Sequence, residues 1–210
     1  VNFDLTEAGI TSVDIHGQTA LKVINLKENE IATFKQDGMP ALTELNLRDN
    51  KLTTFSGTGM TSLKTLNLQG NQLDSHEFDI TDASATLTDL TVSNNGDKFI
   101  TLNLMAFTAL EYFYCDDNPE FTTAVFADNN ANIKKISMNN CHVMHFYSCT
   151  FPNLYSLNLS NNALLDLEEG NYPKLSTLSI DHNYLTALDV TRFPKLGSLY
   201  CGNNNITLLN

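Results

Sequence analysis

Apolar and polar residues alternate along the chain in one short pattern that returns many times. In the segment 42–52, Leu45 and Leu47 flank a polar residue, and Asn50 and Leu52 follow shortly after. Two apolar residues separated by one polar residue have the period of a strand with a single buried face. The pattern therefore predicts a short strand, whose end is marked by the asparagine.

The same pattern recurs about every 21 residues from one end of the chain to the other. Nine strand motifs start at residues 21, 42, 63, 87, 110, 133, 154, 175 and 196. A partial repeat occupies residues 1–20, where Phe3 and Leu5 take inward strand positions. Such regularity is typical of a solenoid, in which each repeat is one coil packed on its neighbours. We therefore expect a single domain over residues 1–210, and the absence of a recognisable polar cap predicts that it is a fragment of a longer chain.

The consensus of the nine motifs is L-x-x-L-x-L-x-x-N-x-L. It resembles the leucine-rich repeat family in its short bacterial surface form, internalin-like in style. The resemblance implies a leucine-rich repeat solenoid, a curved right-handed superhelix with a parallel β-sheet on its concave face (α/β by convention). About ten residues remain for each return path, too few for a regular helix once the turns are subtracted. We therefore expect extended or 3₁₀ segments and little or no α-helix on the convex side.

An asparagine ends most strand motifs, and we expect its side chain to turn inward. Its amide can bond backbone groups left open where the strand bends, and a buried polar group without a partner costs about 1–3 kcal/mol. The predicted structural column is Asn29, Asn50, Asn71, Asn95, Asn118, Asn162, Asn183 and Asn204. Composition agrees with this assignment, because the chain holds 30 Leu for the inward positions and 26 Asn.

The outward strand positions form the natural binding surface, since the inner curve of a solenoid is broad and concave. Most of them are small and polar, but Tyr112 and Tyr114 interrupt the pattern together. Exposed tyrosine offers apolar area and a hydrogen-bonding hydroxyl at low entropic cost. The predicted ligand-binding set is Tyr112, Tyr114, Asp116, Asp89, Lys135 and Asn139. The alternative is that the two tyrosines merely shield the face of the sheet.

The longer repeats support this location. Successive motifs are separated by 21, 21, 24, 23, 23, 21, 21 and 21 residues, so the additions flank the two tyrosines. In solenoids such insertions tend to collect on one face, often the binding face.

One segment carries several residues of the types that bind metals. It contains Cys141, His142, His145 and Cys149. The register places Cys141 at the asparagine position, His142 in the following turn and the other two on the return path. They are therefore not expected to converge on a zinc ion. A disulfide between Cys141 and Cys149 is compatible with their spacing but not required by it. We expect neither a metal nor a cofactor.

Charge and motif content exclude several classes of function. The chain has 12 Lys+Arg against 24 Asp+Glu, and a net charge of -12 does not suit nucleic acid. No run of about 18 apolar residues is present, so this segment is not expected to insert into a membrane. It contains no nucleophile elbow and no phosphate-binding loop. We therefore do not expect an enzyme.

The resemblance implies a non-catalytic recognition or adhesion module, secreted or on a bacterial cell surface. We expect a monomer that binds a protein on its concave face, with any signal or anchor segment outside these 210 residues. Two alternatives remain open. One is a glycan-binding module, because aromatic rings with polar edges also suit sugars. The other is the recognition arm of an enzyme whose catalytic domain lies elsewhere in a longer chain.

Overall fold

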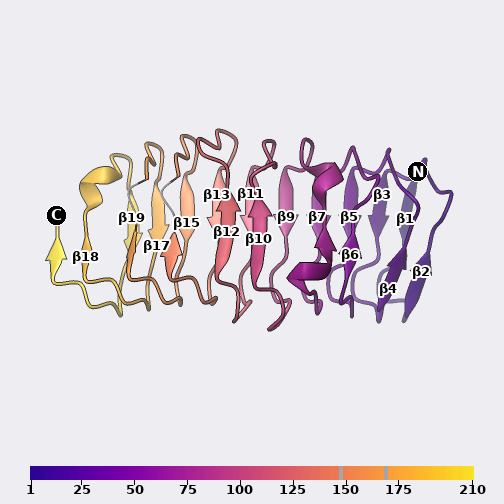
Figure 1. The fold of residues 1–210 in the computed structure, drawn as a ribbon, viewed down its shortest axis with the longest axis horizontal. Coiled ribbons are helices and arrows are strands. Elements are labelled where there is room, and N and C mark those ends of the chain that lie inside the picture. Colours follow the sequence, from indigo (N-terminus) through magenta and orange to yellow (C-terminus); the bar gives the residue numbers. More distant parts are fainter. Residues whose placement is uncertain (147–148, 168–169) are drawn as a thin grey trace.

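A computed structural model describes residues 1–146, 149–167 and 170–210. Its main feature is a ten-stranded parallel sheet, in which each strand comes from one coil (Figure 1). Strands lie beside the next coil's strand in constant register, so that Ile24 lies opposite Leu45 and Leu45 opposite Leu66. The predicted leucine-rich repeat solenoid with a parallel sheet is confirmed.

The strands of this sheet follow one another in chain order. They are β1 (Asn2–Asp4), β3 (Val23–Asn25), β5 (Glu44–Asn46), β7 (Thr65–Asn67), β9 (Asp89–Thr91), β11 (Tyr112–Tyr114), β13 (Lys135–Ser137), β15 (Ser156–Asn158), β17 (Thr177–Ser179) and β19 (Ser198–Tyr200).

The core runs along the inside of the coils. The middle residue of a typical strand, such as Leu45 or Phe113, is fully buried, and so is the next inward residue, such as Leu47. Full burial of such a side chain contributes about 1.5–3 kcal/mol. Because each coil covers the apolar face of its neighbour, this contribution depends on stacking, and a coil alone would leave the same side chains in water.

The return paths are short extended segments that pair two by two. They are β2 (Ser12–Asp14) with β4 (Thr33–Lys35), β6 (Phe55–Ser56) with β8 (Phe78–Asp79), β10 (Thr101–Leu104) with β12 (Thr123–Phe126), β14 (His145–Phe146) with β16 (Asp166–Leu167), and β18 (Ala187–Leu188) with β20 (Leu208–Leu209). Three 3₁₀ helices also occur: η1 (Ser75–Glu77), η2 (Thr81–Ala83) and η3 (Val190–Arg192). No α-helix is found in the described ranges, as the length of the return path predicts. Consistently, no helix in this part of the chain has the length and apolarity needed to cross a membrane.

Aromatic rings stack from coil to coil behind the sheet. One column runs through Phe34, Phe55, Phe78, Phe99 and Phe121, with neighbouring ring centroids 5.6–6.3 Å apart. A second column begins in the coil of Phe121 and runs through Phe126, Phe151, Tyr172 and Phe193. These contacts connect coils of unequal length, because a ring can shift along its neighbour and still remain in contact.

The column asparagines join each coil to the one before. Asn50 is typical: its amide nitrogen donates to the carbonyls of Leu26 (2.9 Å) and Leu47 (3.0 Å), and its Oδ1 accepts from the Ile31 N–H (3.0 Å). All eight predicted members donate to a carbonyl of the preceding coil. The residue before each of them turns the chain through a positive φ, as Asp49 does at 52°. The column therefore forms a continuous hydrogen-bonded ladder.

Candidate functional site

The two tyrosines of the predicted site lie in the middle of the ten-stranded sheet. On β11, Phe113 points into the core, so Tyr112 and Tyr114 point to the opposite, outward face, where both are half-buried. The register places Tyr112 between Asp89 on β9 and Lys135 on β13. Four of the six predicted residues therefore lie on three adjacent strands.

Each tyrosine ring has a lysine over it. The Lys135 Nζ lies 5.1 Å from the centroid of the Tyr114 ring, and the Lys134 Nζ lies 5.8 Å from that of Tyr112. Cation–π contacts of this kind contribute about 0.5–1 kcal/mol at exposed sites. They restrict the motion of both rings and both ammonium groups.

Lys134 was not predicted from the sequence. Its Nζ lies 2.6 Å from the Glu111 Oε2, and this carboxylate is the main cause of a raised pKa of Lys134. Glu111 and Lys134 each follow the first residue of their motif and are 23 residues apart. Opposite charges at one repeat position of adjacent coils were a signal that could have identified the pair. The next coil has Tyr155 at this position, 43% exposed, which extends the row.

Asp116 is held by hydrogen bonds to the neighbouring coil. Its Oδ1 accepts from the Ser137 hydroxyl (2.6 Å) and from the Asn139 N–H (2.7 Å). Ser137 is only 6% exposed, although its strand position faces outward, because this carboxylate covers it. Asn139 in turn accepts from the Asn161 amide (2.9 Å) through Oδ1. Asp116 and Asn139 thus form a rigid polar edge beside Tyr114.

Asp89 forms its side-chain hydrogen bond within its own coil, whereas Asp116 bonds to the neighbouring coil. The Asp89 Oδ2 accepts from the neighbouring Thr88 hydroxyl (2.6 Å), a contact within its own strand region. The structure therefore places all six predicted residues on β9, β11, β13 or directly after these strands. We call these six together with Glu111 and Lys134 the tyrosine patch.

The cysteines and histidines of the segment 141–149 are divided between the asparagine ladder and the return path. Cys141 takes the asparagine position of the ladder, where its thiol donates to the Cys115 carbonyl (Sγ to O, 3.1 Å). Burial is the main cause that raises the pKa of the Cys115 thiol. No disulfide joins Cys141 to Cys149. His145 and Cys149 lie on the return path, and the described residues include no group of three potential ligands that could hold a metal ion.

Comparisons with known proteins agree with the repeat architecture. The family model described as leucine rich repeat matches residues 34–73. Comparison with curated protein sequences finds no match.

Two solved structures share the fold at low sequence identity. A functional domain of InlJ from Listeria monocytogenes, said to include a cysteine ladder, is 21% identical with a TM-score of 0.69 and covers 92% of this chain. A leucine-rich repeat protein of Leptospira interrogans is 18% identical with a TM-score of 0.54 and covers 99% of this chain and 76% of its own. The chain spans about half the length of the InlJ structure (47%). With its nine motifs and ten-stranded parallel sheet, the chain is folded as a leucine-rich repeat solenoid with repeats of about 21 residues, and residues 34–73 match the leucine rich repeat family model.

Proposed function

We propose that this chain is a non-catalytic recognition module that binds a protein partner through the tyrosine patch on its concave face. The fold itself suggests a protein-interaction module. The observation that carries the finer proposal is the placement of Tyr112 under Lys134 and of Tyr114 under Lys135 in the middle of the sheet. Tyrosine rings with a polar rim are typical of residues that dominate binding energy in protein interfaces.

Several side chains of the tyrosine patch are already held in one conformation, which also favours binding. A partner must normally freeze flexible side chains, at about 0.5–1.5 kcal/mol for each long one. Here Lys134 is already held by Glu111, and Asp116 by Ser137 and Asn139. The cost of ordering the patch is therefore smaller than its content of lysine and carboxylate suggests.

The same contacts favour a protein over a glycan. A sugar would stack on an open aromatic face, whereas the Lys135 ammonium lies over the ring of Tyr114. A protein partner can place a carboxylate on this ammonium group and an apolar side chain against the exposed edge of the ring. The mixed charges of Glu111, Lys134 and Asp116 favour a partner surface that is likewise mixed.

We further propose that the module acts outside the cell, secreted or on a bacterial surface, as an adhesive arm of a longer chain. The support is the likeness of fold to the InlJ domain from Listeria monocytogenes. We propose a monomer, since binding of one partner needs no second copy, and a single domain over residues 1–210.

The test is a screen of the chain against an array of purified extracellular proteins and against a glycan array. We expect protein hits whose affinity falls at least tenfold in the Tyr112→Ala/Tyr114→Ala double variant. Tyr184→Ala is the matched control, because Tyr184 is 57% exposed but lies outside the strands of the sheet. Equal affinity of the double variant and the wild type would rule out the tyrosine patch. Glycan hits lost in the double variant would replace the protein partner with a sugar.

A further inference from the structure

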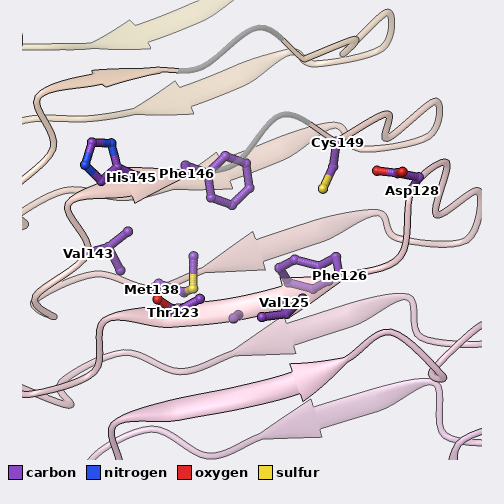
Figure 2. A pocket seen from close by; sticks show the side chains of 10 residues that line it. Thr123, Val125, Phe126, Asp128, Met138, Val143, His145, Phe146 and Cys149 are labelled. Carbon is purple, nitrogen blue, oxygen red and sulfur yellow. The ribbon is translucent and has the colours of Figure 1, made fainter.

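The return side of the middle coils contains an apolar pocket that the tyrosine patch does not use. It lies between β12 and β14, encloses about 330 Å³ and is shown in Figure 2. Its floor and walls include Phe126, Met138, Val143 and Phe146, all of which belong to the buried core. The pocket thus gives an outside molecule direct access to core side chains.

The pocket has a cause in the sequence. Val143 and Phe121 occupy the same repeat position in adjacent coils. The carbonyl of each accepts a hydrogen bond from the next coil: the Phe121 carbonyl from the His142 N–H, and the Val143 carbonyl from the Ala163 N–H. The first aromatic column, as far as the described residues show, ends at Phe121, where the next coil offers a smaller side chain. In addition, β12 and β14 belong to different two-stranded sheets. The pocket lies where Val143 is smaller than Phe121 and where the edges of β12 and β14 are not paired with each other.

The ionisable groups at the pocket lie at its two ends. Figure 2 shows Asp128 and Cys149 at one end and His145 at the other. Asp128 is exposed, and its carboxylate makes no ion pair within the described ranges. Behind the other end, the Asp166 Oδ1 lies 3.8 Å from the His145 Nδ1. Both ends are therefore acidic or paired with an acid, in a chain whose net charge is -12.

We propose that this pocket binds a small apolar molecule that carries one ammonium group. Ligand sites in proteins typically enclose about 300–1,000 Å³, with mostly apolar walls and a few polar groups that set orientation. An aromatic or aliphatic body fills the space between Phe126 and Phe146 and removes apolar surface from water. The ammonium group then lies at the Asp128 carboxylate. A carboxylate ligand is disfavoured, because it meets Asp128 as a like charge.

The test uses three probes of similar shape: 2-phenylethylamine, 2-phenylethanol and 3-phenylpropanoate. Their affinities are measured by calorimetry or by ligand-observed NMR on the whole chain. We expect the amine to bind most tightly and the carboxylate most weakly. Asp128→Asn should weaken only the amine, by about two- to fivefold, as for an exposed ion pair. Glu120→Gln is the control, because it makes the same change of charge at an exposed residue of the same coil outside the pocket.

A second variant tests the location of the bound ring. Ala124 is half-buried and lines the pocket, so Ala124→Trp should fill it and abolish binding of the amine. Alkylation of Cys149, followed by mass spectrometry, should be slowed by the bound amine in the wild type. Tyr112→Ala/Tyr114→Ala should leave amine binding unchanged, which separates this site from the tyrosine patch. The proposal is overturned if no probe binds, if the carboxylate binds as tightly as the amine, or if a folded Ala124→Trp variant still binds.

Discussion

At the scale of the residue, the ladder shows why one position tolerates a cysteine. In the regular coils, the Oδ1 of each column asparagine accepts a hydrogen bond from a backbone N–H of the preceding coil. That N–H belongs to the first inward residue after the preceding coil's own column asparagine, as when Leu164 donates to Asn183 (3.0 Å). In the coil before Cys141, the corresponding N–H belongs to Phe121. That group instead donates to the Asn118 carbonyl (3.0 Å), because the chain makes an added turn there. No acceptor is therefore needed at position 141, and a thiol donor suffices.

This difference predicts unequal costs for the same truncation. Asn183→Ala leaves the Leu164 N–H and the Leu159 and Ile180 carbonyls without their side-chain partner. We expect it to lower the free energy of unfolding by about 2 kcal/mol or more. Cys141→Ala removes only the weak contacts of a half-buried thiol with the carbonyls of Cys115 and Asn139 and should cost less than about 1 kcal/mol. Urea unfolding of both variants, followed by circular dichroism, measures the difference, and equal costs would contradict this account of the ladder.

At the scale of the element, short aspartate turns set the start of the 3₁₀ helices and of several return paths. Before η2, the Asp79 Oδ1 accepts from the N–H (2.9 Å) and the hydroxyl (2.7 Å) of Thr81. The same arrangement joins Asp189 to Thr191 at η3. A carboxylate forms stronger hydrogen bonds than its protonated form, so these bonds lower the pKa of Asp79 from its ordinary value of 3.8, the backbone N–H most of all.

The lowered pKa makes the contribution of this turn depend on pH. Because the pKa of Asp79 is lower in the folded state, the turn stabilises the fold at pH values above 3.8, and this contribution is lost as the pH falls through the folded-state pKa. We expect Asp79→Asn to be less stable than the wild type at pH 6 and the difference to shrink by pH 2–3. Urea unfolding across this range measures it. Asp189→Asn should behave in the same way, and a difference that does not vary with pH would refute the assignment.

At the scale of the whole molecule, the coils were predictable because the sequence repeats one signal nine times. Each inward leucine and each ladder asparagine has equivalents in other coils, so a chance match at one position could not mislead the register. The contact of Lys134 with Tyr112 was not predictable in this way, because it depends on how far a long side chain reaches across one pair of coils. The pocket beside Phe146 is similar, since it depends on how the side chains of β12 and β14 pack across two coils whose return strands are not paired with each other.

A stack of coils should also unfold by parts. Each coil contacts only its neighbours, so stability approximates a sum of coil and interface contributions, and loss of one interface affects nearby coils first. Leu66 is 1% exposed on β7, and Leu66→Ala should cost about 2–5 kcal/mol. We expect faster amide hydrogen exchange in β5, β7 and β9, with β17 and β19 unchanged. Leu178→Ala on β17, which truncates a fully buried leucine, should give the reverse distribution. If both variants accelerated exchange uniformly along the chain, the solenoid would instead unfold as one cooperative unit.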